Sequence, residues 1–384
     1  MKPELQNPVK EALQALSKSA SASNHADERS SGLEHRTLDS VFAGPRGLRA
    51  GWSIFLFAAM FYLFRQIVGT IFFASGLIGE SKGDSSTTVL LGELIPFVAL
   101  FGATAFMGLI EGRRIVAYNL AGLHSARNFL SGLAAGFSAL SLLVGALAWG
   151  GWLRFGAASY SGAQSLRLAA VWACAFLVVG FVEEGLFRCY ALFTLARGVS
   201  FWWALAAEIA VCLYLLLSGG GHGAWGVYAA ASLGLFPCLM LYRRSGARSA
   251  FWQAAWVTST VFGLYHTSNG GENWIGVLAA AFIGFVFCVS VRLTGSAWWA
   301  IGCHAAWDWA ETFFYGTADS GLQAQGHLLT TAPAGNAIWS GGSDGPEGSL
   351  LVLGVILLLL LMVLFLYGRS KARASGAPAT PQTA

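Results

Sequence analysis

Charge is the scarcest feature of this sequence. Only 11% of its 384 residues are Asp, Glu, Lys or Arg, whereas a soluble domain typically has about 25% charged residues. A chain this poor in charge cannot cover its surface with polar groups. Its 55% hydrophobic content and mean hydropathy of +0.59 point the same way. The composition therefore excludes an ordinary soluble protein and predicts one that is solvated by a lipid bilayer.

Four further absences narrow the range of possible functions. The net charge of +4 comes with basic residues that adjoin apolar runs, so these residues indicate membrane topology and no nucleic-acid partner. The six cysteines lie in apolar stretches without a CxxC pair, so we expect no disulfide and no cysteine-ligated metal. No apolar core follows a basic start, and we therefore expect no cleavable signal peptide. No HExxH zinc motif occurs.

Long apolar runs dominate what remains. A membrane helix needs about 20 mostly apolar residues. Ten stretches meet that requirement, and we expect an all-α, polytopic transmembrane helix bundle of about ten spans. The predicted spans are 51–78, 88–111, 128–150, 168–192, 200–218, 223–242, 250–267, 273–293, 295–316 and 349–367.

The basic residues predict how these spans are oriented. With ten spans and a cytoplasmic start, most Arg residues between spans fall on the cytoplasmic side, which places both termini inside. We therefore expect a multi-pass integral membrane protein, in a bacterial cytoplasmic membrane. The expected parts are a disordered N-terminal tail (1–44), N-terminal helices (45–165), a core (166–316), an extracytoplasmic loop (317–348), a final span (349–369) and a disordered tail (370–384).

Several ionisable residues lie inside the predicted spans. Each costs about 2.5–3.5 kcal/mol at bilayer depth on insertion scales, so such residues usually face the bundle interior and serve function. Glu184 and Arg188 are four residues apart and can pair on one helix face, while Glu183 points about 100° away. His304 and Asp308 share a face in the same way, and a third span ends at His266.

These residue types support two kinds of hydrolytic site. The first is a site in which a carboxylate activates water and imidazoles stabilise an oxyanion. The second is a metal site in which one divalent metal such as zinc is held by Glu183, His266 and His304, with water in an open position. Taken singly, each residue is explained as well by a structural ion pair or an interhelical hydrogen bond. A transporter with an acidic proton relay also remains open, although no inverted repeat is obvious.

At these residues the sequence resembles the CPBP family, the CAAX-processing and bacteriocin-processing intramembrane proteases also called Abi proteins. The family's EExxxR motif is matched by Glu183, Glu184 and Arg188, and its FxxxH motif by Phe262 and His266. Its HxxxN or HxxxD motif is matched by His304 and Asp308. The likeness covers about 166–316. It departs from the usual pattern by an inserted hairpin near 200–242 and by Asp308, where many relatives have Asn.

The resemblance implies an intramembrane endopeptidase that cuts a membrane-associated or CAAX-like peptide, which makes a peptide or lipidated peptide and the bilayer its partners. By motif position, Glu183 is the water-activating base, Glu184 and Arg188 support it, and His266 assists activation. His304 with Asp308 contacts the oxyanion. An ionised Asp308 cannot donate a hydrogen bond, so it would be protonated, ligate a metal or orient His304. A non-catalytic membrane scaffold or a bacteriocin-immunity protein of the same fold is the alternative.

Overall fold

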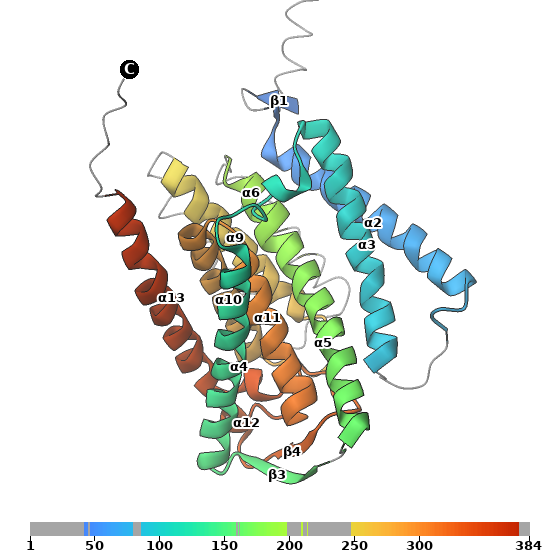
Figure 1. The fold of residues 1–384 in the computed structure, drawn as a ribbon, viewed down its shortest axis with the longest axis vertical. Helices are drawn as coiled ribbons and strands as arrows, with labels where there is room; N and C mark the ends of the chain where they lie inside the picture. The colour runs from blue at the N-terminus through green and yellow to red at the C-terminus, as the bar shows by residue number, and fades with distance from the viewer. Residues whose placement is uncertain are drawn as a thin grey trace, which may run out of the picture. The chain divides into compact units, whose positions relative to one another are not determined.

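Figure 1 shows the fold of the chain in a computed structural model. The described residues are 42–44, 47–79, 86–158, 160, 162–197, 209, 213 and 247–375, with side chains from Ser249 to Gly368 in the last range. Residues Met1–Ser53 and Ile54–Ala384 form two units. In the first, β1 (Ala43–Gly44) and β2 (Gly47–Leu48) form an antiparallel pair.

Six helical segments are long and apolar enough to cross a membrane, and the protein is an integral membrane protein. One of them, Gly162–Leu195, combines α5 (Gly162–Glu184), the π-helix η2 (Gly185–Ala191) and α6 (Leu192–Leu195). The other segments lie in α2 (Ala50–Ala74), α3 (Ser86–Glu111), α4 (Ser125–Trp149), α10 (Trp274–Thr294) and α13 (Leu351–Ser375).

Two further helices complete the core although they are not among those six. They are α9 (Ala247–His266) and α11 (Trp298–Trp309), which continues as the π-helix η3 (Ala310–Tyr315). Eight of the ten predicted spans therefore coincide with helices of a mostly helical protein. The remaining two, 200–218 and 223–242, form the predicted hairpin and lie outside the described residues except for Ile209 and Leu213. Ten spans thus stays a prediction.

The structure departs from the predicted boundaries near the C-terminus. α13 continues to Ser375, past the predicted end of the span at 369, so the start of the predicted disordered tail is helical. The predicted loop 317–348 contains β4 (Leu329–Pro333), α12 (Ala337–Ser340) and the 3-10 turn η4 (Pro346–Gly348). β4 pairs antiparallel with β3 (Leu153–Ala158). Backbone pairing with a distant segment does not depend on the apolar runs and the composition from which the boundaries were predicted.

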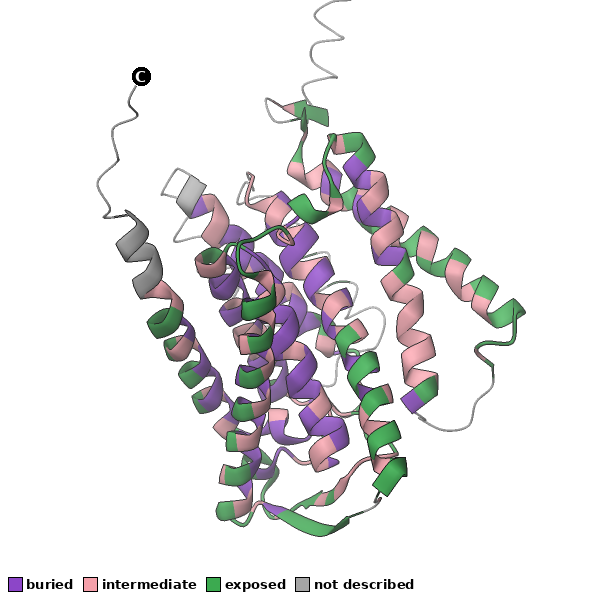
Figure 2. Cartoon of the chain, viewed as in Figure 1, coloured by how far each residue is buried: buried purple, intermediate pink, exposed green. Residues whose placement is uncertain are grey.

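Glycines let α4 and α11 approach closely at the centre of the bundle. A Cβ atom on Gly132 would lie 2.2 Å from the carbonyl oxygen of Trp299, and one on Gly136 would lie 2.0 Å from that of Cys303. Such small residues allow helix backbones to touch in a bilayer, where apolar side chains gain little from leaving lipid. Figure 2 shows the buried residues concentrated along α4, α10 and α11. Of these helices, α11 carries His304 and Asp308, so the close packing holds part of the predicted site in place.

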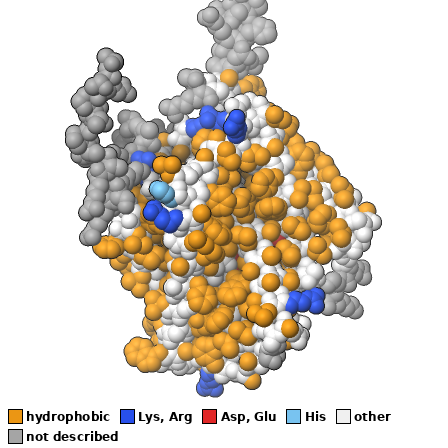
Figure 3. Space-filling model, in the orientation of Figure 1, with side chains coloured by type: hydrophobic (Ala, Val, Ile, Leu, Met, Phe, Trp, Pro, Cys, Tyr) orange, Lys and Arg blue, Asp and Glu red, His pale blue; other side chains and the backbone are white. Residues whose placement is uncertain are grey.

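Large hydrophobic side chains are exposed on the outward faces of the helices. α13 exposes a series of leucines and phenylalanines, and Figure 3 shows hydrophobic side chains over most of the face in view, with Lys and Arg gathered near its edges. A lipid-facing surface has this composition, because the hydrocarbon core tolerates few charges. The exposed large side chains on α13 are Leu357, Leu358, Leu361, Leu364, Phe365 and Leu366.

The contact between α4 and α11 predicts a pair of glycine variants with opposite behaviour. Gly136→Ala forces backbone atoms apart, and we expect a loss of about 1–3 kcal/mol of stability, as for other overpacked sites. Gly145→Ala, on the same helix, meets no atom within 4 Å and should be neutral or stabilising. Thermal unfolding in detergent measures both. Equal melting temperatures for the two variants would contradict this account of the packing.

Candidate active site

A buried ion pair joins two of the sequence-predicted residues. Arg188 Nη1 lies 3.2 Å from Glu184 Oε1, and both side chains have no exposed surface. The four-residue spacing that predicted this pair is kept although Arg188 lies within the π-helix η2. Glu184 Oε1 also accepts a hydrogen bond of 2.9 Å from His304 Nδ1. A single carboxylate therefore connects α5 with α11.

Aromatic rings surround the guanidinium of Arg188. Its Cζ atom lies 4.1 Å from the ring centroid of Phe262, on α9, and 5.4 Å from that of Phe287, on α10. Cations are attracted to the faces of such rings, and the attraction grows when water is excluded. Gly284 of α10 leaves the space for this arrangement, because a Cβ atom there would lie 2.3 Å from Arg188 Nη2. The buried charge pair is thus enclosed by α9 and α10 as well.

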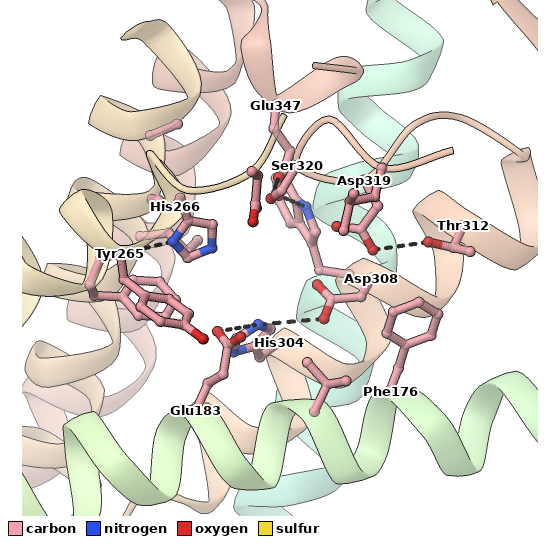
Figure 4. Close-up of a pocket in the computed structure, with 18 of the residues that line it drawn as sticks. Phe176, Glu183, Tyr265, His266, His304, Asp308, Thr312, Asp319, Ser320 and Glu347 are labelled. Carbon is pink, nitrogen blue, oxygen red and sulfur yellow. Dashed lines mark hydrogen bonds and ion pairs between the residues drawn. The ribbon is translucent and has the colours of Figure 1, made fainter. Parts of the chain in front are cut away.

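Glu183 behaves differently from its neighbour. Its side chain is 21% exposed and lines a cavity of about 330 Å³. Figure 4 shows it rising from α5 into that cavity. Its Oε2 atom lies 3.7 Å from His304 Nε2 and has no hydrogen-bond partner. Adjacent residues on one helix therefore carry a fully buried carboxylate and one that faces open space.

His304 lies between carboxylates on both sides of its ring. Nδ1 contacts Glu184, while Nε2 lies 3.4 Å from Asp308 Oδ2 as well as 3.7 Å from Glu183. Carboxylates only accept hydrogen bonds when ionised, so all of these contacts are favourable when both ring nitrogens carry protons. Asp308 is one helical turn after His304 and is also buried. Its position fits the role of orienting the imidazole.

His266 lies at the end of α9 and lines the same cavity. Its Nδ1 atom is 2.8 Å from the carbonyl oxygen of Phe262. Because a carbonyl only accepts, Nδ1 carries the proton, and Nε2 of the neutral ring presents a lone pair. Figure 4 shows this ring facing the cavity from a different side than Glu183. Glu183, His266, His304 and Asp308, from three separate segments, thus share one cavity, while Glu184 and Arg188 lie behind it.

The structure groups other residues at this cavity that the motifs did not identify. Glu93 of α3 and Tyr265 of α9 line it, together with Asp319 and Glu347 from the segment before α13. Among the described residues, the one set of three Asp, Glu, His or Cys side chains whose ligand atoms lie within 4.8 Å of one another is Glu311, Asp319 and Glu347. The predicted metal set of Glu183, His266 and His304 does not form such a compact group.

Two more carboxyl groups meet beside the N-terminus of α10. A Cβ atom on Gly276 would lie 2.3 Å from Asp344 Oδ2 and 2.4 Å from Glu272 Oε1, so both groups crowd the same point. Burial, and then the nearby acids Glu347 and Asp319, raise the pKa of Asp344 to about 8. Burial and the neighbouring Asp344 raise the pKa of Glu272 to about 10. These groups hold protons that the unfolded chain would release.

Residues 239–310 match the model of a protein family described as type II CAAX prenyl endopeptidase, Rce1-like. The matched range includes the FxxxH motif at Phe262 and His266 and the later motif at His304 and Asp308. The first motif, at Glu183, Glu184 and Arg188, lies before it, and the contact between Glu184 and His304 joins the two in space. No curated protein and no solved structure matches the chain.

The buried pair predicts that removal of one partner is worse than removal of both. Glu184→Gln leaves Arg188 as an uncompensated buried cation, and we expect a loss of about 3–5 kcal/mol of stability. The double variant Glu184→Leu with Arg188→Met should recover most of that loss. Thermal unfolding in detergent measures the difference. A double variant as unstable as the single one would show that this ion pair does not account for the effect.

The raised carboxyl pKa values predict how stability depends on pH. The pKa of Asp344 rises from the ordinary value of 3.8 to about 8 on folding. Only the unfolded state ionises between these values, so stability should fall as pH rises from about 4 to about 8. Asp344→Asn keeps an acceptor for Asn273 N–H and should make that fall shallower. Melting temperatures at pH 5 and pH 8 in metal-free buffer test this, and identical pH slopes for variant and wild type would refute it.

Proposed function

We propose that this chain is a CAAX-type intramembrane protease in which Glu183 activates a water molecule to hydrolyse a peptide bond. The match of residues 239–310 to the type II CAAX prenyl endopeptidase model supports the protease class. One observation carries this proposal. The Glu183 carboxylate is the one member of the EExxxR motif that faces the cavity, and it lies beside His304 there. A general base must reach the water and the substrate carbonyl together, and this position meets that requirement.

The reaction follows from the positions of the side chains. Glu183 takes a proton from water as the water oxygen bonds to the carbonyl carbon of the peptide. The carbonyl oxygen becomes an oxyanion, and proton donors in the cavity stabilise it. The C–N bond then breaks, and the proton held by Glu183 passes to the leaving amine. Glu183 returns to the carboxylate form, so one water is consumed and one peptide bond is cut.

The two histidines have separate parts in this proposal. His304 is a proton donor next to Glu183, held in place by Glu184 at Nδ1 and by Asp308 at Nε2. His266 presents Nε2 to the cavity, because its Nδ1 proton is engaged by the Phe262 carbonyl. It can therefore help to orient the attacking water by accepting a hydrogen bond. Asp308 acts through His304, as a positioning residue.

The cavity walls favour an apolar or lipidated peptide. Val89, Phe176 and Val179 line it near Glu183, and Ile283 and Phe287 line the side formed by α10. Long apolar groups enter such surroundings readily, because they leave water or lipid without losing hydrogen bonds. We therefore propose a membrane-associated peptide substrate, with a CAAX-like prenylated C-terminus as its most specific form.

We propose that this hydrolysis does not use zinc. Both nitrogens of His304 face carboxylate oxygens, and a ring protonated at both positions has no lone pair for a metal. His266, Glu183 and His304 also do not bring their ligand atoms together as a compact set. Cleavage should therefore persist with 1,10-phenanthroline, a chelator of transition metals. Loss of cleavage with the chelator, restored by added zinc, would contradict this part.

The proposal is tested with purified protein in detergent and a lipidated CAAX-type peptide. Glu183→Gln and His266→Ala should each lower the cleavage rate by about 10²–10⁴-fold, the usual range for loss of acid–base groups. Both variants should keep the melting temperature of the wild type within a few degrees. Mass spectrometry of the products gives the rate and the cut site.

Two matched variants control for the loss of an acid or of a histidine. Asp344→Asn removes a buried acid that does not line the cavity, and His124→Asn replaces an exposed histidine whose left-handed backbone (φ 64°) Asn tolerates. Both should cleave at nearly the wild-type rate. If Glu183→Gln cleaves as fast as these controls, water activation by Glu183 is wrong. If cells that express Glu183→Gln behave like cells that express the wild-type protein, the non-catalytic binding role is favoured instead.

A further inference from the structure

A second group of acids lies across the cavity from Glu183. Glu311 belongs to the π-helix η3, while Asp319 and Glu347 come from the segment that precedes α13. One oxygen atom from each of the three carboxylates lies within 4.8 Å of the other two. Figure 4 shows Asp319 and Glu347 at the end of the cavity away from Glu183. Three carboxylates from these two segments therefore converge on one point.

Neutral donors fix the orientation of each carboxylate. Trp307 Nε1 donates to Glu311 Oε2 at 3.1 Å and to Glu347 Oε1 at 2.7 Å. Thr312 Oγ1 donates to Asp319 Oδ2 at 2.9 Å, and Ser320 Oγ donates to Glu347 Oε2 at 2.7 Å. Such contacts are typical of the shell that orients metal ligands, and they leave the charge of the carboxylates uncompensated.

The charge in this group has no basic partner. Glu311 is fully buried, and its Oε1 atom has no hydrogen-bond partner. No Lys or Arg occurs from 293 to 349, and none of the three acids makes an ion pair with a basic side chain in the described part of the chain. An isolated buried carboxylate is costly, and it is relieved by a proton or by a cation. The unpartnered Glu311 oxygen is therefore open to a proton or to a cation.

We propose that Glu311, Asp319 and Glu347 bind one divalent cation, and that the site prefers Ca²⁺. The ligands are all oxygen atoms, which excludes the soft or nitrogen-rich sites that zinc and copper prefer. Ca²⁺ binds oxygens at about 2.3–2.6 Å, so ligands on opposite sides of the ion lie about 5 Å apart. The three ligand oxygens lie within 4.8 Å of one another, so one ion of this size can reach all of them. Mg²⁺ usually keeps several waters, which a largely buried group admits less readily.

A bound cation would connect parts of the protein that pack around the active site. η3 follows directly from α11, the helix that carries His304 and Asp308. Asp319 and Glu347 belong to the segment between η3 and α13 that forms one wall of the cavity. The cation would therefore fix this wall against the helix that holds the imidazole. It is separate from the residues proposed to activate water, so the site goes beyond the proposed function.

Terbium luminescence tests the site on the full chain in a zwitterionic detergent. Tb³⁺ replaces Ca²⁺ and emits when a nearby indole is excited, and Trp307 contacts two of the proposed ligands. We expect saturable emission that Ca²⁺ displaces at lower concentration than Mg²⁺. Asp319→Asn and Glu347→Gln should each weaken binding by at least about ten-fold, because affinity for such ions follows the charge of the ligand set. Ca²⁺ should also raise the melting temperature of the wild type but not of these variants.

The controls separate this site from general attraction to acids and from catalysis. Asp344→Asn removes a nearby buried acid outside the three ligands and should change the Tb³⁺ affinity by less than about three-fold. Glu183→Gln should bind Tb³⁺ as the wild type does, even though it is expected to lose cleavage. Asp319 and Glu347 are only half-buried, so their variants should fold where Glu311→Gln fails. No saturable emission in the wild type, or equal affinity in Asp319→Asn and Glu347→Gln, would overturn the proposal.

Discussion

The arrangement of the core depends on one buried carboxylate, Glu184. In a bilayer a lone charge at depth is costly, and this one is satisfied by Arg188 on its own helix segment and by His304 on α11. The rings of Phe262 and Phe287 enclose the guanidinium and so bring α9 and α10 into the same unit. Three motifs that are distant in sequence are therefore one electrostatic cluster in space. The contact between Glu184 and His304 is the one hydrogen bond that ties the imidazole to α5 in the described part of the chain.

This constraint explains why two adjacent glutamates differ. The helix directs Glu184 into the cluster and, about 100° around its axis, directs Glu183 toward the cavity. The exposed fractions of their side chains, 0% and 21%, record that division. A π-helix begins directly after Glu184, and such irregular turns occur frequently at functional sites. The pair thus places a carboxylate with a structural role, Glu184, next to one that faces the cavity, Glu183.

Sequence reasoning reached the parts of this site that depend on local geometry. A four-residue spacing sufficed to predict that Glu184 meets Arg188 and that Asp308 lies beside His304, because both pairs are fixed by the helix alone. The hydrogen bond from His304 to Glu184 crosses between helices, and no periodicity encodes it. Asp319 and Glu347 lie in a segment rich in Gly and Ser, where neither helix nor strand period marks the inward side. The one feature of the sequence that could have pointed to Asp319 and Glu347 is the absence of Lys and Arg around them.

Asp308 is where the two sets of acids meet. Its Oδ2 atom lies 3.4 Å from His304 Nε2, against 3.7 Å for Glu183 Oε2, and Asp308 lies on the same continuous helix as Glu311, three residues earlier. Many relatives in the family that this chain resembles have an amide at this position. An amide carries no charge, so it would not compete through charge for a proton on His304 Nε2. A cation held by Glu311, Asp319 and Glu347 would weaken the attraction of Asp308 for the proton, because opposite charges nearby lower a carboxylate's proton affinity. The acid in place of an amide and the second group of acids are thus parts of one electrostatic arrangement along α11.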